Sequence, residues 1–163
     1  MIPEYVQGLR ELVGSDRLLW LPGVNMVVHD SSSGRVLLHR RSDTGEWSLL
    51  SGILNIGEDP AHGAAREVLE ETGVHVVPER LVAVTVSPKI THPNGDRAQY
   101  LEVLFLCRPR DPGACPRVND DESLAVDWFA TDGLPDMRPY VADRIAMALE
   151  AGSRQAWFTP AGG

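Results

Sequence analysis

One arginine and three glutamates stand close together in the chain, at Arg66, Glu67, Glu70 and Glu71. A helix advances about 100° per residue, so Glu71 would lie about 40° to one side of Glu67 and Glu70 about 60° to the other. Arg66 precedes Glu70 by four residues, the spacing at which opposite charges pair on a helix. Carboxylate oxygens on one rigid face can bind a hard divalent cation. The four residues therefore indicate either a metal site or a solvated helix surface.

The solvated surface is the simpler interpretation, because runs of charge on a helix usually face water. Two features count against it. Like charges on one patch repel each other, and a solvated helix normally intersperses lysines among its acids. The acids also fall in the C-terminal half of the expected helix, where the helix dipole disfavours negative charge. A bound cation would relieve both penalties, but helix geometry alone leaves the two interpretations open.

The helix that carries these acids is expected over residues 60–72. Asp59 is a typical N-cap, Pro60 suits the first helical position, and Gly73 suits the position just after the last turn. Small and apolar residues lie roughly opposite the acids and predict a packing stripe: Ala61, Ala64, Ala65, Val68 and Thr72. We therefore expect one packing stripe and one acidic stripe on this helix.

The acids also belong to a longer pattern that begins before the helix. Residues 52–74 match G-x5-E-x7-R-E-U-x-E-E-x-G-U at every defined position, where U is a bulky aliphatic residue. This segment resembles the Nudix box, the signature of the Nudix hydrolase family, and a motif of this length and fixed spacing is specific. The likeness extends from about residue 24 to about residue 129. The chain departs from it at Leu50 and Ser51, where many members have Pro-Gly, and at Asn55, where members often have an acid.

The resemblance implies an α/β (α+β) sandwich with a Nudix-like fold, in which a central mixed β-sheet lies between helices. The patterns of β-rich and helical segments agree with that fold class. An Asn-Gly turn at 94–95 is expected between the strands over 80–87 and 98–108. Helices are predicted over 3–14, 60–72 and 138–152; strands are predicted over 23–30, 35–41, 80–87, 98–108 and 124–130, with a short strand or extended loop at 47–54.

The length of 163 residues predicts one domain over 1–152, which includes an N-terminal helix, followed by a loose tail over 153–163. A net charge of −8 and a pI near 5.0 argue against a long nucleic-acid partner, because phosphate neutralisation needs a basic surface. No apolar run predicts a membrane span, and the N-terminus lacks the features of a signal peptide, so we expect a cytoplasmic protein. Assembly as a homodimer stays open.

The resemblance assigns metal and catalytic roles to the box residues. Glu70 and Glu71 are the expected metal ligands, and Glu67 is expected to be a ligand or a general base. Arg66 would orient a neighbouring acid and take part in catalysis. Ser51, just before the box, is expected at the metal site. Mg²⁺ is the expected cofactor, with Mn²⁺ as a substitute, because Mg²⁺ prefers oxygen ligands.

A further general base is expected on the loop that follows the box. Glu122 stands where the family commonly places such an acid, six residues before Trp128. Asp120 and Asp121 are rivals for this role, and each of these acids is also compatible with an ordinary solvated loop. Glu58 is expected to support the loop before the helix, either through the metal or as an acid favoured by the helix dipole.

Four residues are candidates for substrate binding. Arg41 would meet a phosphate, and Trp47 would stack on a base, although an aromatic residue near a strand more often packs in the core. Asn94 and Tyr100 are expected to line the cleft near the Asn-Gly turn. The histidines His39, His62 and His75 show no ligand spacing, so we expect surface or satisfied side chains there.

The function implied is Mg²⁺-dependent hydrolysis of a phosphoric anhydride in a nucleoside diphosphate linked to another moiety, of ADP-ribose or nucleotide-sugar type. The substrate would be a small phosphorylated nucleotide. The first alternative is a nucleoside triphosphate pyrophosphohydrolase. A second is a non-catalytic ligand sensor, which should have lost box acids that this chain keeps. A third, an isomerase of isopentenyl diphosphate, needs a catalytic cysteine, but Cys107 and Cys115 lie well downstream of the box.

Overall fold

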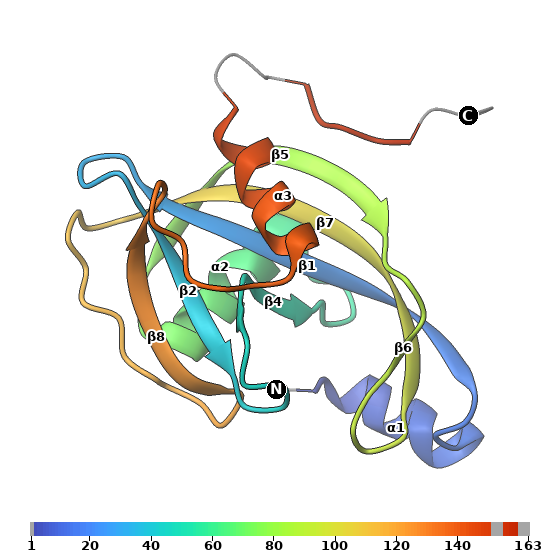
Figure 1. Cartoon of the computed structure of the whole chain (residues 1–163). Coiled ribbons are helices and arrows are strands. Elements are labelled where there is room, and N and C mark those ends of the chain that lie inside the picture. Colours follow the sequence, from blue (N-terminus) through green and yellow to red (C-terminus); the bar gives the residue numbers. More distant parts are fainter. Residues whose placement is uncertain (1, 151–154, 160–163) are drawn as a thin grey trace.

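A computed structural model describes residues 2–150 and 155–159 of the chain. Within these residues, helices flank a central sheet (Figure 1). The helices are α1 (Glu4–Val13), α2 (Pro60–Thr72) and α3 (Pro139–Leu149). The strands are β1 (Leu18–Asp30), β2 (Arg35–Arg41), β3 (Trp47–Ser48), β4 (Leu50–Ile53), β5 (Val76–Val86), β6 (Ile90–Thr91), β7 (Arg97–Pro109) and β8 (Ser123–Ala130).

The sheet is mixed, as the sequence predicts. Its main path runs in the order β3-β2-β1-β7-β5, and β4, β8 and β6 pair with β1, β2 and β7 respectively. Strands β1 and β7 are parallel, whereas the other pairings are antiparallel. The predicted hairpin of β1 and β2 forms, with Val28 opposite Leu37. The sheet thus places β4 and β2 beside β1, next to the helix that carries the acids of the box.

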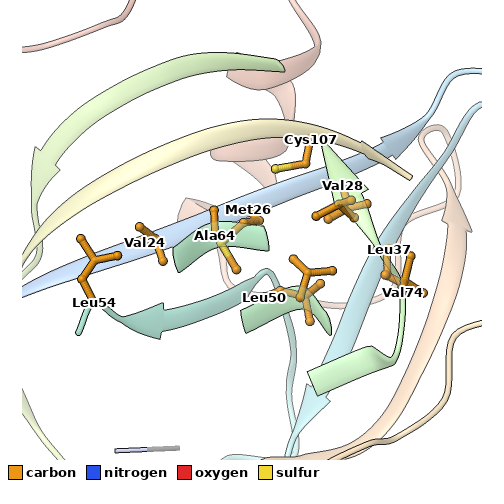
Figure 2. Packing of buried hydrophobic residues seen from close by; sticks show 11 residues of the cluster. Val24, Met26, Val28, Leu37, Leu50, Leu54, Ala64, Val74 and Cys107 are labelled. Carbon is orange, nitrogen blue, oxygen red and sulfur yellow. The ribbon is translucent and has the colours of Figure 1, made fainter. Parts of the chain in front are cut away.

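The two faces of the sheet bury separate hydrophobic clusters, because side chains alternate along each strand. On one face, Val24, Met26 and Val28 of β1 pack with Ala64 of α2 and with Cys107 (Figure 2). On the other face, Val27 packs in a cluster that includes Ile145 of α3. Helices α2 and α3 therefore cover opposite faces, and the predicted sandwich is confirmed.

Two strands begin four or five residues earlier than the sequence predicts. Strand β1 starts at Leu18 rather than at residue 23, and its parallel pairing with β7 runs through Pro22. Strand β5 starts at Val76 rather than at residue 80, with an irregular register near Pro78. Proline and glycine mark turns in a sequence, but pairing with a long neighbouring strand has extended both strands across them.

Part of the predicted loose tail is hydrogen-bonded to the sheet. The backbone N–H of Trp157 donates to the carbonyl of Val82 at 2.8 Å, and the N–H of Val84 donates to the carbonyl of Trp157 at 3.0 Å. Residues 153–154 and 160–163 of that tail, and residues 151–152 of the predicted last helix, lie outside the described residues. Of the helices described, none has the length and apolar character that a membrane crossing requires.

Candidate metal centre

Helix α2 turns two of its acids towards the sheet. Glu67 and Glu71 are each only 1% exposed, and they share the buried side of the helix with Ala64 and Val68. The side chain of Glu70, in contrast, is 44% exposed. The expected acidic stripe is therefore divided, and the interpretation as a solvated surface is wrong for Glu67 and Glu71. The ends of helix α2 are also as predicted: Pro60 is its first residue, and Gly73 follows its last turn in the left-handed conformation, with φ of 69°.

Glu67 lies directly against the backbone of β4. A Cβ atom added at Gly52 would stand 2.0 Å from the Cδ atom of Glu67, far inside van der Waals contact. Gly52 pairs with Val24 of β1, so the position lies within the sheet rather than in a free loop. The first glycine of the box is thus required because the Glu67 carboxyl occupies the space where a side chain would project.

Arg66 joins the loop before the helix to the acids on the helix. Its Nε donates to Glu58 Oε1 at 2.7 Å, and its Nη1 donates to Glu67 at 2.9 Å and to Glu70 at 3.1 Å. Its Nη2 also donates to the backbone carbonyl of Ile53 at 3.3 Å. The hydrogen bonds from Arg66 lower the pKa of the Glu58 carboxyl. The guanidinium therefore orients Glu67 and Glu70 and ties both of them to the end of β4.

The buried carboxyls resist ionisation. Burial raises the pKa of Glu67 to about 7, although the Arg66 charge and hydrogen bond act in the opposite direction. Burial also raises the pKa of Glu71 well above its usual range, and the negative charges of Glu67 and Glu122 add to that shift. A nearby cation would stabilise the charged forms of both carboxyls.

Glu71 meets two acids from the loop between β7 and β8. One ligand oxygen from each of Glu71, Asp120 and Glu122 lies within 4.8 Å of the others. Glu71 Oε2 and Asp120 Oδ2 are buried and have no hydrogen-bond partner among the described residues. Buried polar atoms are normally hydrogen-bonded, so these two oxygens need an explanation. A hard divalent cation fits this donor set, because Mg²⁺ and Mn²⁺ prefer carboxylate oxygens.

Asn119 holds this loop against the C-terminal end of α2. Its side-chain amide donates to the carbonyls of Leu69 at 3.3 Å and Glu70 at 3.0 Å, and its backbone N–H donates to the carbonyl of Glu71 at 3.2 Å. The last carbonyls of a helix lack partners within the helix, so Asn119 satisfies groups that would otherwise need water. The loop acids are therefore positioned by the same helix that carries Glu71.

His39 is a member of the site that the sequence interpretation missed. It lies on β2, is 1% exposed, and its Nδ1 atom is 2.9 Å from Ser123 Oγ and 3.9 Å from Glu71 Oε2. Burial and the neighbouring Arg41 charge lower its pKa to about 4, so the ring is neutral at physiological pH. The signal available was strand alternation, because His39 shares a face of β2 with Leu37, which packs in the α2 cluster.

The remaining predicted site residues are distributed around this centre. The side chain of Ser51 projects to the sheet face opposite Gly52 and the acids, because neighbouring residues alternate along β4. Arg41 pairs with Asp43 at 2.7 Å, and this hydrogen bond raises the pKa of the guanidinium. The negative charges of Glu71 and Glu122 act in the same direction. Arg41 is thus a predicted substrate residue whose charge interacts with Glu71 and Glu122.

The other three predicted substrate residues make contacts with other side chains. Trp47 packs edge-to-face on Phe129, with ring centroids 4.7 Å apart, in the cluster on the α3 face. The hydroxyl of Tyr100 is 2.9 Å from His92 Nε2. Asn94 lies in an exposed turn, where its amide donates to Asp96 at 3.0 Å. None of these contacts joins Trp47, Tyr100 or Asn94 to Glu71 among the described residues.

Known proteins resemble this chain in sequence and in fold. The family model for the NUDIX domain matches residues 20–149. A MutT-like protein of Streptomyces ambofaciens is 36% identical over 118 residues, which cover 72% of this chain and 70% of that protein. The NAD-capped RNA hydrolase NudC of Klebsiella pneumoniae is 28% identical over 133 residues; the match covers 77% of this chain but only 48%, about half, of that enzyme.

One solved structure of similar fold is that of an ADP-ribose pyrophosphatase from Streptococcus suis. It aligns with a TM-score of 0.60 and 27% sequence identity. The alignment covers 88% of this chain and 96% of that one, so the two folds correspond over almost their whole lengths.

Proposed function

This chain belongs to the Nudix family and is a hydrolase of pyrophosphate bonds, and on that premise we propose a Mg²⁺-dependent enzyme for nucleoside diphosphates linked to a second moiety. Substrates of ADP-ribose or nucleotide-sugar type belong to this class. Water adds across the P–O–P bridge, so ADP-ribose would yield AMP and ribose 5-phosphate. Mn²⁺ is expected to replace Mg²⁺.

The observation that carries this proposal is the group formed by Glu71, Asp120 and Glu122. Their oxygens lie within 4.8 Å of one another, and two oxygens of the group are buried with no partner among the described residues. Three ionised carboxyls in one place repel one another, and a cation between them relieves that repulsion. Glu71, Asp120 and Glu122 would hold the ion, which when bound supplies neutralisation of the phosphate oxygens and activation of water.

The other residues of the centre would position these groups. Arg66 holds Glu67 and Glu70 by hydrogen bonds, so that both acids keep fixed directions above β4. Arg41, which already pairs with Asp43, would bind a phosphate of the substrate at the edge of the acidic group. A planar guanidinium suits this task, because its N–H groups match phosphate oxygens in pairs.

The proton from the attacking water needs an acceptor. We assign this role to Glu122, the exposed member of the acidic group, because one of its oxygens would face the ion while the other can accept a proton from a bound water. Glu67 is the alternative, because its pKa of about 7 is near the value that suits a general base at neutral pH. The two assignments predict different pH–rate profiles.

The substrate class rests on the named relatives and on the charge of the chain. The structure from Streptococcus suis is named an ADP-ribose pyrophosphatase, and the Klebsiella pneumoniae relative is named for an NAD cap. ADP-ribose and NAD, the compounds in these names, are both nucleoside diphosphates joined to a second group. A net charge of −8 favours a small substrate over a long RNA, because phosphate backbones bind basic surfaces.

A panel of substrates tests the proposal. ADP-ribose, UDP-glucose and dGTP would be incubated with the protein and Mg²⁺, and the products would be separated by chromatography. We expect kcat/KM for ADP-ribose or UDP-glucose to exceed that for dGTP at least tenfold, and activity to vanish in excess EDTA. Turnover of dGTP alone would support the triphosphate alternative, and turnover in EDTA would remove the metal from the mechanism.

A further inference from the structure

His39 connects two parts of the metal centre that are distant in sequence. It projects from β2, and its Nδ1 atom is 2.9 Å from Ser123 Oγ and 3.9 Å from Glu71 Oε2. The ring is only 1% exposed, so its surroundings are fixed protein groups rather than bulk water. The histidine thus lies between the carboxyl of α2 and the start of β8.

Ser123 is well placed to transmit the position of His39 to the loop acids. It is the first residue of β8, follows Glu122 directly, and pairs with Arg41 of β2. The backbone N–H of Ser42 also donates to the carbonyl of Glu122 at 2.9 Å. The end of the loop is therefore attached to β2 by the Ser42–Glu122 backbone hydrogen bond, by the pairing of β8 with β2, and by the side-chain bond between Ser123 and His39.

The beginning of the same segment is attached to α2. The amide of Asn119 donates to carbonyls at the end of that helix, as described above. Asp120 and Glu122 thus lie between an anchor on α2 and an anchor on β2. A segment fixed at both ends loses little conformational entropy when it binds a ligand, and this favours binding.

We propose that His39 is a positioning residue of the metal centre: its hydrogen bond to Ser123 holds Asp120 and Glu122 at the separation from Glu71 that a single cation can bridge. This inference rests on the proposed function, since it requires that the acids bind a divalent ion. A histidine that only fills the core would contribute to folding but would leave the affinity for the ion unchanged.

Metal binding to the folded full-length chain tests this role without reference to activity. Affinity for Mn²⁺ would be measured by isothermal titration calorimetry for the wild type, His39→Leu, His39→Asn and Ser123→Ala, with the melting temperature of each. Partners that orient metal ligands typically contribute about 10- to 100-fold to affinity. We expect at least a tenfold loss in His39→Leu and in Ser123→Ala, because each removes one end of the hydrogen bond.

His39→Asn separates positioning from packing. Its side-chain amide can replace Nδ1 as a partner of Ser123 but leaves a cavity, so we expect a lower melting temperature with Mn²⁺ affinity within about threefold of the wild type. Leucine fills most of the space of His39 but cannot bond to Ser123. In His39→Leu we therefore expect a melting temperature near that of the wild type, together with weaker Mn²⁺ binding. The double variant that combines His39→Leu with Ser123→Ala should bind no more weakly than the weaker single variant, because both changes break the same bond.

His62→Leu is the matched control, because the His62 side chain is 83% exposed and lies on the same helix as Glu71. It should leave Mn²⁺ affinity unchanged. Wild-type affinity in both His39→Leu and Ser123→Ala would overturn the positioning role while leaving the proposed function intact. Failure of the wild type itself to bind Mn²⁺ or Mg²⁺ would instead overturn the proposed function.

Discussion

The carboxyl of Glu67 occupies the space into which a side chain at Gly52 would project. The distance from an added Cβ atom to Glu67 Cδ would be 2.0 Å, and Arg66 holds the Glu67 carboxyl by a hydrogen bond of 2.9 Å. The helix and β4 therefore approach each other closely only because residue 52 is glycine.

Gly52→Ala should consequently displace Glu67 and weaken the protein. Overpacking of this kind costs about 1–3 kcal/mol, and the displaced carboxyl should lower kcat by roughly tenfold or more. The melting temperature and the kcat of the variant would be measured together. Gly8→Ala is the control, since nothing lies within 4 Å of an added Cβ there. An unchanged melting temperature and kcat in Gly52→Ala would contradict this prediction, because they would show that the helix moves to accommodate the methyl group at no energetic cost.

Glu71→Gln should separate metal binding from folding. Burial and neighbouring acids raise the pKa of Glu71, so its charge is unfavourable in the absence of a cation. In EDTA at pH 8, replacement of this ionisable carboxyl by a neutral amide should raise stability by about 1 kcal/mol, or roughly 2–4 °C in melting temperature. Mn²⁺ affinity should fall at least tenfold. Glu11→Gln, in the exposed part of α1, should change neither value, and a Glu71→Gln protein that binds Mn²⁺ normally would exclude Glu71 as a ligand.

The pH dependence of stability should reveal Glu67. Its pKa is about 7 in the folded protein, against a usual value of 4.5, so the folded state binds the proton more tightly than the unfolded state. This contribution is complete below about pH 4.5 and is lost as the pH rises through about 7. In EDTA, the free energy of unfolding of the wild type relative to Glu67→Gln should therefore decline between those values.

The quantity to measure is the difference in free energy of unfolding between the wild type and Glu67→Gln. His39 is present in both proteins, and its titration changes stability with pH in the opposite direction, so its effect cancels in the difference. Its lowered pKa of about 4 makes the fold less stable as the pH falls from about 6.5. Denaturant titrations at several pH values would give both curves. A constant difference from pH 4 to pH 8 would contradict the raised pKa of Glu67, and Mn²⁺ should reverse the decline because it favours the ionised acid.

Local signals predicted the helix of the box, whereas the environment of its acids depended on the sheet. Asp59, Pro60 and Gly73 are close in sequence to the ends they mark, and α2 has the predicted bounds. The sequence places Glu67 and Glu71 on an acidic stripe, whereas packing of the helix against the sheet buries both side chains. His39 could not be linked to Glu71 from sequence, because β8 and the loop that bring Ser123 to it lie far along the chain.

The contact of the loop acids with Glu71 also depends on parts of the chain that are distant in sequence. Glu122 and Asp120 were both candidates, and the structure brings both to Glu71, since Asn119 attaches their loop to the end of α2. A loop rich in proline and glycine gives no periodic pattern from which such a contact could be predicted. Trp47 packs against Phe129 instead, which agrees with the core alternative that its position near a strand indicated.

The identity of the general base can be decided by two pH–rate profiles. If Glu122 accepts the proton, Glu122→Gln should lower kcat by about 10²–10⁴ and flatten the acidic limb of the profile. Glu67→Gln should then leave the shape of that limb unchanged. Asp121→Asn, the neighbouring change, is the control and should have an effect within about threefold, as ordinary surface changes do. A flattened limb in Glu67→Gln alone would assign the base to the helix.

The most direct test of the metal centre is a crystal structure of the protein grown with Mn²⁺, with anomalous scattering measured to locate the ion. We expect an anomalous peak bonded to Glu71 and to at least one of Asp120 and Glu122, at oxygen distances of about 2.0–2.3 Å. A structure with Glu71→Gln under the same conditions should lose or weaken that peak. A Mn²⁺ peak elsewhere, with the oxygens of Glu71, Asp120 and Glu122 contacting only water, would contradict the claim that these carboxyls hold the catalytic ion.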